Sequence, residues 1–363
     1  MDRKALALER VARAKSSYTV RHVRMESHGS LMVGDARPRA GDVVLARVKE
    51  IGHHTRIELA NGRRSVLFPG DEVIVAYGNR YAPQQYEAEV PPDLSSCELV
   101  AAGGIAARTL CRHTRMSGAT KIDPLGLITD AAGRVLNLDR WRMAEPADPP
   151  KIPPTFAIVG TSMDSGKTTA VAGLIRGLVR SGLRVGAAKV TGTGAGGDLW
   201  LMGDAGASAV LDFTHAGYAS TYRCTAENVL NIARTLVGHL ATAGVDVIVL
   251  ELADGIYQAE TAALLCDSAF TSSIDGALFA ATDAAGAAFG VANLRSLRIT
   301  PLAVTGLLTS SPLAAREART ALDGMLVLDA TELAHGLVAD QLLRMIGRDS
   351  KVAPKAFANS HEQ

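Results

Sequence analysis

The sequence is poor in aromatic residues and in cysteine, and it contains no long apolar run. Phe, Trp and Tyr make up 4% of the 363 residues, which argues against an aromatic-rich binding module and favours an α/β protein with tight helix–strand packing. No two of the cysteines form a Cys-x-x-Cys pair, and so few in a chain of this length are not a disulfide framework. We therefore expect reduced thiols at Cys97, Cys111, Cys224 and Cys266.

Other missing features indicate the cellular compartment and argue against some kinds of partner. No stretch reaches the roughly 18 uncharged apolar residues of a membrane-spanning helix. The charged N-terminus has no apolar core of the kind found in a secretory signal. The formal net charge of +1 provides no strong basic footprint for nucleic acid. These features predict a cytoplasmic protein that neither crosses a membrane nor binds nucleic acid.

The length and the proline distribution indicate two domains. At about 150 residues per domain, the chain is long enough for two hydrophobic cores. Five of the 14 prolines lie within residues 144–154, and such a run resists both helix and central strand. We expect an N-terminal domain over 1–143, a proline-rich linker over 144–154, a second domain over 155–350 and a tail over 351–363.

The N-terminal part carries the pattern of short, closely spaced strands. A helix is predicted over the first 16 residues, and Asn61-Gly62 is typical of a type I′ hairpin turn. The spacing predicts a small β-barrel or sandwich. The predicted strands cover residues 42–48, 55–59, 64–68, 72–77, 97–102 and 125–129.

Beyond the linker, apolar strands alternate with helices, which is typical of a parallel sheet covered on both faces. The expected fold class is therefore α/β, a parallel-sheet domain preceded by a small mostly-β domain. Strands are predicted over 156–159, 185–190, 246–250, 277–281, 301–307 and 327–328, and helices over 168–180, 227–243, 284–297 and 312–322.

The strongest functional signal is the segment FAIVGTSMDSGKTT at 156–169, between a predicted strand and a predicted helix. It is close to Gly-x-x-x-x-Gly-Lys-Ser/Thr, the phosphate-binding loop of P-loop NTPases. Gly160 lies one residue earlier than this pattern requires, and Thr161 takes the first glycine position. The residues predicted to bind the nucleotide are Gly160, Thr161, Ser162, Met163, Asp164, Ser165, Gly166, Lys167, Thr168 and Thr169.

Three of these side chains carry the expected chemistry. Lys167 is expected to reach the β- and γ-phosphates, and the Thr168 hydroxyl is expected to bind Mg²⁺. These roles make ATP and Mg²⁺ the predicted cofactors. Asp164 either acts as a base that orients a nucleophile or bonds to its own loop backbone, and both interpretations stay open.

The loop variant G-T-x-x-x-x-G-K-T resembles that of dethiobiotin synthetase. It is also similar to the loop of the cobyrinic-acid amidotransferases, which often have Asp at the position of Asp164. Both families belong to the SIMIBI class of P-loop NTPases, with the cell-division ATPases and the nickel or molybdenum cofactor accessory proteins. The resemblance extends in order over residues 156–320 and implies a homodimer. Dethiobiotin synthetase itself lacks a large N-terminal β domain.

A second segment, AKVTGTG at 188–194, resembles the Lys-Pro-Val-x-Ser-Gly segment of dethiobiotin synthetase. Lys189 and Thr193 match its Lys and Ser, whereas Val190 replaces the Pro. The resemblance implies that Lys189 acts near the transferred phosphoryl group and makes Thr193 a candidate substrate contact. The alternative is a lysine that ends a strand in solvent.

The family also has an Asp that helps to hold Mg²⁺ a few residues further on. Asp198 follows Gly196-Gly197 in a predicted flexible acidic turn and is the first candidate, with Asp204 as the alternative. A turn-forming role for Asp198 is equally compatible with the sequence, because Asp is common in turns.

The strand over 246–251 ends in Glu251, which matches the Mg²⁺-binding Glu of the same class. Leu252 replaces the glycine that follows this Glu in the family, and glycine returns only at Gly255. This departure leaves open whether Glu251 or Asp254 meets the metal, and Asp254 is also a candidate substrate contact. Mg²⁺ needs only one or two carboxylates besides phosphates and waters.

Together these residues predict a Mg·ATP-dependent phosphoryl-transfer enzyme. It would activate a carboxylate, carbamate or hydroxyl of a small-molecule substrate, with Lys167 and Lys189 neutralising the charge of the transferred group. The alternative is an NTPase switch or metallochaperone that delivers a cofactor to a partner protein. A switch should hydrolyse slowly alone and faster with its partner, whereas an enzyme should consume ATP in proportion to an added metabolite.

Overall fold

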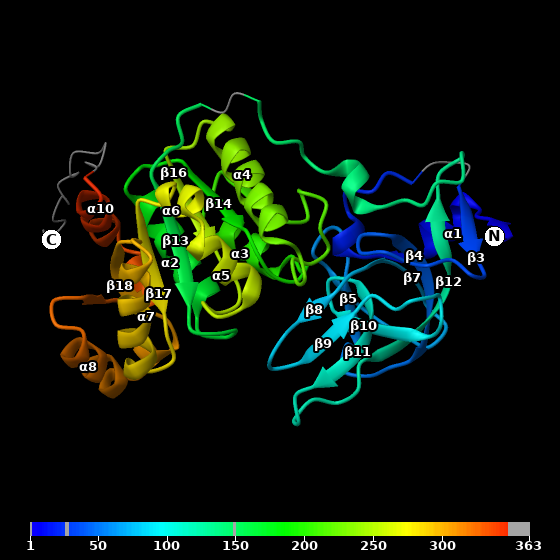
Figure 1. Ribbon diagram of the computed structural model, residues 1–363, viewed down its shortest axis with the longest axis horizontal. Coiled ribbons are helices and arrows are strands. Elements are labelled where there is room, and N and C mark those ends of the chain that lie inside the picture. Colours follow the sequence, from blue (N-terminus) through cyan, green and yellow to red (C-terminus); the bar gives the residue numbers. More distant parts are fainter. Residues whose placement is uncertain (1, 26–28, 148–149, 348–363) are drawn as a thin grey trace, which may run out of the picture.

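The computed structural model describes residues 2–25, 29–147 and 150–347, which form two regions with different kinds of sheet (Figure 1). Residues 2–143, here the N-terminal β region, are mostly strands in a mixed sheet. Residues 155–347, the α/β region, alternate strands with helices around a parallel sheet. The expected fold class is confirmed. The predicted tail over 351–363 lies outside the described residues.

The segment that joins the two regions has no regular structure where it is described. Residues 144–147 and 150–154 form neither helix nor strand, as expected for a proline-rich stretch. No helix in the described ranges combines the length and the apolar character needed to cross a membrane.

The N-terminal β region contains a closed ring of strands. Strand β10 pairs with both β11 and β12, which joins β12, β4, β7, β11 and β10 into a barrel. Its elements are β1 (Asp2–Ala5), α1 (Leu8–Arg13), β2 (Lys15–Ser16), β3 (Ser30–Val33), β4 (Val43–Glu50), β5 (Arg56–Glu58), β6 (Arg64–Val66), β7 (Glu72–Tyr77), β8 (Arg80–Tyr81), β9 (Tyr86–Glu89), β10 (Cys97–Ala101), β11 (Ile105–Arg112) and β12 (Thr120–Thr129). Of the two expected architectures, the barrel is the one present.

The first 16 residues do not form the predicted helix. Helix α1 covers only Leu8–Arg13. Residues 2–5 pair with β3 as an antiparallel edge strand, and residues 15–16 pair in parallel with β7. Pairing with strands that are distant in sequence overrides local helix propensity here.

The predicted hairpin joins β5 to β6, but its turn is not type I′. Gly62 has a φ of 82°, whereas Asn61 is not in the positive region, and type I′ requires positive φ at both central residues. The Leu59 N–H donates to the Arg63 carbonyl, and the Gly62 N–H donates to the Leu59 carbonyl, each over 2.9 Å. This pattern belongs to the longer hairpin loop that ends in a left-handed glycine.

The α/β region is built on seven parallel strands in the order β15-β14-β16-β13-β17-β18-β19. Every strand and helix predicted for it is present within one or two residues. Its elements are β13 (Thr155–Gly160), α2 (Lys167–Arg180), β14 (Val185–Lys189), α3 (Gly197–Asp204), β15 (Ala209–Asp212), α4 (Ala226–Thr242), β16 (Val247–Glu251), α5 (Ala259–Cys266), α6 (Ser268–Ser272), β17 (Gly276–Ala280), α7 (Ala284–Ser296), β18 (Pro301–Thr305), α8 (Pro312–Ala321), β19 (Leu326–Val327), α9 (Ala330–Leu333) and α10 (Gly336–Met345).

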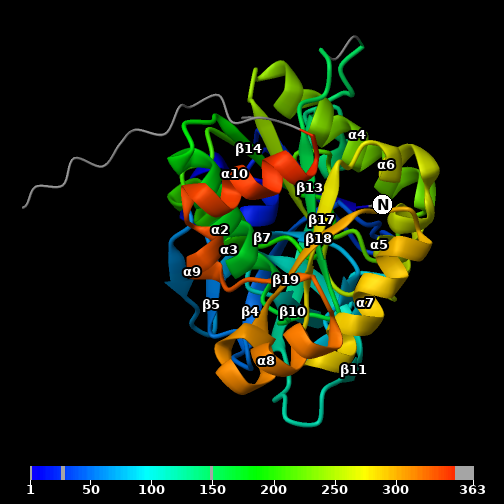
Figure 2. The same ribbon diagram turned by 90° about the vertical axis from the view of Figure 1, so that its left-hand side faces the viewer.

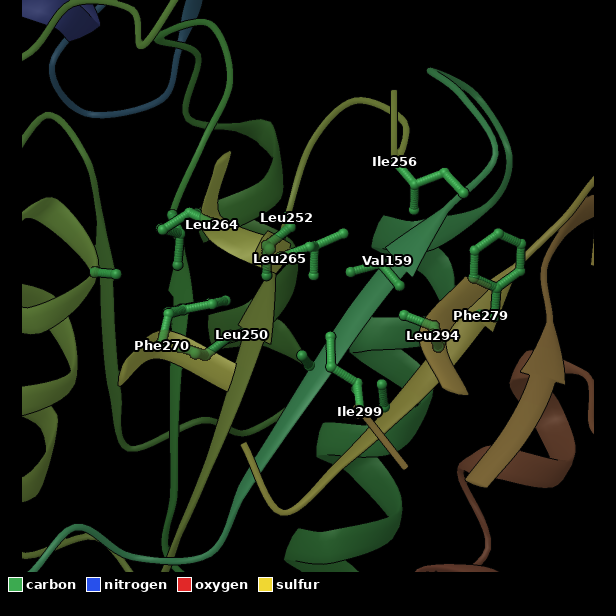
Figure 3. Close-up of a cluster of buried hydrophobic side chains, with 14 of the residues drawn as sticks. Val159, Leu250, Leu252, Ile256, Leu264, Leu265, Phe270, Phe279, Leu294 and Ile299 are labelled. Atoms are coloured by element: carbon green, nitrogen blue, oxygen red, sulfur yellow. The ribbon is translucent and has the colours of Figure 1, made fainter. Parts of the chain in front are cut away.

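Helices cover both faces of this sheet, with α2, α9 and α10 on one side and α5, α6 and α7 on the other (Figure 2). Consecutive strand residues point to opposite faces, so Phe156 and Ile158 of β13 pack under α2, while Ala157 and Val159 pack on the other side. The residues labelled on that second side in Figure 3 are Val159, Leu250, Leu252, Ile256, Leu264, Leu265, Phe270, Phe279, Leu294 and Ile299.

Buried polar contacts join the N-terminal β region to the α/β region. The Tyr18 hydroxyl donates to Asp212 Oδ2 over 2.7 Å, and the Trp200 indole N–H donates to Glu58 Oε1 over 2.7 Å. Tyr18, Glu58 and Asp212 are almost fully buried. Because polar groups this deep need their partners, these bonds hold the two regions in one arrangement.

Asp212 provides a test of this interface. Burial alone would raise its pKa, but His215 and Arg21 outweigh burial and hold the pKa of Asp212 below its ordinary value. We expect D212N to lower the free energy of unfolding at pH 7 by about 2–4 kcal/mol, since it leaves buried partners of the carboxylate unsatisfied.

The pH dependence of this loss follows from the lowered pKa. The stability that Asp212 contributes is complete above about pH 5 and is lost as the pH falls below about 4. Denaturant unfolding should therefore show a smaller difference between D212N and the native protein at pH 3 than at pH 7. The exposed Asp35 offers the control D35N, and an equal difference at both pH values would contradict the assignment.

Candidate functional site

The predicted phosphate loop connects β13 to α2 and is shaped by two glycines. Gly166 precedes α2 with a φ of 95°, and a Cβ there would lie 2.9 Å from the Gly306 Cα. A Cβ on Gly160 would lie 2.6 Å from the Ala280 carbonyl oxygen and 2.5 Å from the Ser165 hydroxyl. Gly160 therefore fits the closely packed end of β13, which accounts for a glycine one residue earlier than the general pattern.

Lys167, the first residue of α2, lies inside the loop with only 5% of its surface exposed. Its ammonium donates to the carbonyl of Ser162 over 2.6 Å and to the carbonyl of Asp254. Burial lowers the pKa of Lys167, and the carboxylates of Glu251 and Asp254 oppose that shift. The loop thus holds a buried cation at a helix N-terminus, where the helix dipole also favours anions.

Thr168 and Glu251 are brought together by the parallel pairing of β13 with β16. The Thr168 hydroxyl donates to Glu251 Oε1 over 2.9 Å. Glu251 is 2% exposed, and its Oε2 has no hydrogen-bond partner in the described part of the chain. Burial raises the pKa of Glu251, while the nearby Lys189 lowers it. A buried carboxylate oxygen without a donor is costly, so the pair fits a site for a cation.

Lys189 ends β14 beside Glu251 and forms an ion pair with Asp198. Burial would lower the pKa of Lys189, but the carboxylates of Asp198 and Glu251 outweigh it and raise the pKa. The predicted flexible turn at 196–198 is wrong, because Asp198 stands in the first turn of α3. An acidic residue is favourable there, since the helix dipole is positive at this end.

A cavity of about 560 Å³ lies over the loop and is lined by both regions. Thr193 and Asp254 line it, together with the loop and strand-end residues described above. Asp204 stands at the opposite end of α3 and is not part of this wall. The predicted residues in the wall are Met163, Asp164, Gly166, Lys167, Thr168, Thr169, Lys189, Thr193, Asp198, Glu251 and Asp254, whereas Gly160, Thr161, Ser162 and Ser165 are not.

The facing wall comes from the N-terminal β region and was not predicted. It contains Arg80 and Tyr81 of β8 and Gln85 from the turn that leads to β9. His54 is buried and also lines the cavity. Burial lowers the pKa of His54 to about 3, so its imidazole is neutral near pH 7. No local motif marks these residues, because only the docking of the two regions brings them to the site.

Comparison with known proteins yields distant structural similarity alone. No protein-family model matches the chain, and no curated protein matches it. The chain is similar to the signal recognition particle 54 kDa protein from Aeropyrum pernix K1 in complex with GDP, with 21% identity and a TM-score of 0.37. The match covers 58% of this chain and 52% of that chain, so it spans about half the length of that protein.

Two structures of the signal recognition particle receptor FtsY from Elizabethkingia anophelis are also similar. The complex with GDP has 17% identity and a TM-score of 0.37, and the match covers 54% of this chain and 67% of that one. The second structure has 16% identity and a TM-score of 0.35, with 54% and 69% covered. Similarity at this level concerns the arrangement of helices and strands and says nothing of activity.

The close approach at Gly166 gives a test of the loop geometry. We expect G166A to destabilise the protein because alanine disfavours a positive φ and its Cβ would contact the Gly306 backbone. Gly324 is the matched control, with a φ of 77° and nothing within 4 Å of an added Cβ. Denaturant unfolding should show about 1 kcal/mol lost in G324A and at least about 1 kcal/mol more in G166A. Equal losses of unfolding free energy in G166A and G324A would mean that the loop can shift to accommodate the added Cβ.

Proposed function

We propose that the chain binds Mg·ATP at the loop over 160–169 and transfers the terminal phosphoryl group to a small-molecule acceptor in the cavity. The observation that carries this proposal is the unpartnered Oε2 of buried Glu251, beside the Thr168 hydroxyl. Lys167 lies at the start of the same helix. A glycine-capped helix N-terminus, a buried lysine, a hydroxyl and a carboxylate are the groups that phosphoryl transfer requires.

The residues fit the metal as well as the phosphates. Thr168 and Glu251 would hold Mg²⁺, which usually takes one or two protein ligands together with phosphate oxygens and waters. When bound, the metal supplies positive charge that offsets the charge of the transferred group. Lys167 would turn from the loop carbonyls toward the phosphates. Lys189 would add a second cation, held in place by Asp198.

The cavity favours a small-molecule acceptor over a bare NTPase. Its volume of about 560 Å³ lies within the usual range of small-ligand sites, about 300–1,000 Å³. It continues from the loop to side chains of the N-terminal β region, beyond the residues that would hold phosphates. Asp254 and Thr193 also line the cavity and are the proposed substrate contacts of the α/β region.

A metabolite screen for stimulated ADP release by the purified full chain tests this function. We expect hydrolysis to be slow alone and to rise with one class of small acceptor, in proportion to the acceptor added. ADP release that no metabolite stimulates but that rises with a partner protein would favour an NTPase switch.

Lys167 is the first residue to vary. K167A should abolish nucleotide hydrolysis and weaken triphosphate binding by at least about tenfold, because a charged hydrogen-bond donor to the phosphates is lost. Isothermal titration with a non-hydrolysable ATP analogue measures the affinity. The exposed Lys151 offers the control K151A, which should bind like the native protein. If K167A still hydrolyses the nucleotide, the proposed role of Lys167 in phosphoryl transfer is wrong.

Glu251 tests the metal site through pH. Its carboxyl must be ionised to hold Mg²⁺, and burial raises its pKa, so Mg²⁺ affinity should fall with pH earlier than for an ordinary Glu near 4.3. E251Q should weaken Mg²⁺ binding by at least about tenfold and flatten this pH dependence. Titration of Mg²⁺ against the nucleotide complex at several pH values measures both effects. An unchanged titration in E251Q would reassign the ligand to Asp254.

A further inference from the structure

The guanidinium of Arg80 is buried in the cavity wall and is only partly satisfied. Arg80 is 5% exposed, and its Nη2 donates to Gln85 Oε1 over 2.6 Å. Its Nε and Nη1 are closed to solvent and have no hydrogen-bond partner within the described residues. The Tyr86 ring provides a further contact, with its centroid 6.0 Å from the guanidinium carbon. Leaving two donors of a buried cation unpaired is costly, so this geometry is typical of a site that an anion completes.

Arg80 and the predicted phosphate loop belong to different regions of the chain. It stands on β8 in the N-terminal β region, whereas Lys167 and Lys189 stand on the opposite wall. Asp254 also lines the cavity, and all three cations act to lower the pKa of its carboxyl. His54 and Tyr81 also stand in this wall, and both are uncharged near pH 7, since burial lowers the pKa of His54 to about 3 and raises that of Tyr81. The loop end of the cavity thus has two lysines, while the far end has one arginine.

We propose that the Arg80 side chain turns toward the cavity and binds a carboxylate of the acceptor molecule through Nε and Nη1, the two guanidinium donors without a partner in the described residues. This inference rests on the proposed function, because it assigns the second substrate of the same cavity. A carboxylate accepts two parallel N–H bonds from one guanidinium. A phosphate carries more charge and would lie against the nearby Asp254 with a single cation to balance it. The N-terminal β region then has a function, since it selects acceptors with an acidic group.

Small carboxylates probe this site directly in the full chain. Acetate, succinate and glutarate would be titrated into protein saturated with Mg²⁺ and a non-hydrolysable ATP analogue, with the matching amides and inorganic phosphate as comparisons. We expect at least one carboxylate to bind and its amide not to bind. R80Q should weaken that carboxylate by about 10- to 100-fold, the effect of losing a charge-assisted hydrogen bond.

The control variant is R108Q, which makes the same change at an exposed arginine of β11 that pairs with Glu89. It should bind the carboxylate like the native protein. The nucleotide analogue should bind R80Q with an affinity within about threefold of the native value, since Arg80 contacts no phosphate in this assignment. A loss of nucleotide affinity in R80Q that matches the loss for the carboxylate would make Arg80 a phosphate ligand and overturn the inference.

Other outcomes of the same titrations would also overturn the assignment. These are binding of inorganic phosphate alone, and carboxylate binding that R80Q leaves unchanged. The failure of every carboxylate to bind while the nucleotide still binds would overturn it too. Absence of nucleotide binding in the native protein would instead overturn the proposed function itself.

Discussion

A cluster of buried charges at the carboxyl edge of the parallel sheet is the constraint on which the candidate site depends. Lys167, Lys189, Asp198 and Glu251 are held within one cavity by the ends of β14 and β16 and the starts of α2 and α3. Charges this deep are tolerated only when they compensate one another or bind a ligand. The two lysines balance the two carboxylates in charge, and the buried Glu251 Oε2 has no hydrogen-bond partner within the described residues.

The N-terminal β region turns this edge of the sheet into an enclosed cavity. Its barrel is docked by buried bonds such as Tyr18 to Asp212, and Asp212 is the strand partner of Lys189 at the same edge of the sheet. Docking sets the position of β8, and β8 in turn brings Arg80 into the same cavity as the loop over 160–169. The stability of the interface and the shape of the cavity are therefore coupled.

Much of the α/β region could be predicted because its signals are local. Apolar strands and amphipathic helices have a periodicity that neighbouring residues share, so β13, α2 and β16 were found within one or two residues of their observed ends. The errors arose where distant pairing decides the structure. Residues 2–5 join the edge of a sheet instead of a helix. The glycines before Asp198 indicated a flexible turn, whereas Asp198 lies in the first turn of α3.

The sequence alone determined the loop over 160–169, because a strand, a glycine-capped turn and a helix start are encoded by adjacent residues. It also placed Glu251 at a strand end, where parallel pairing brings carboxyl ends to one edge. Only the tertiary structure decided that Glu251, rather than Asp254, bonds to Thr168 and that Arg80 faces the loop from another region. These juxtapositions join residues that are more than 80 positions apart, and the packing that creates them leaves no short-range pattern.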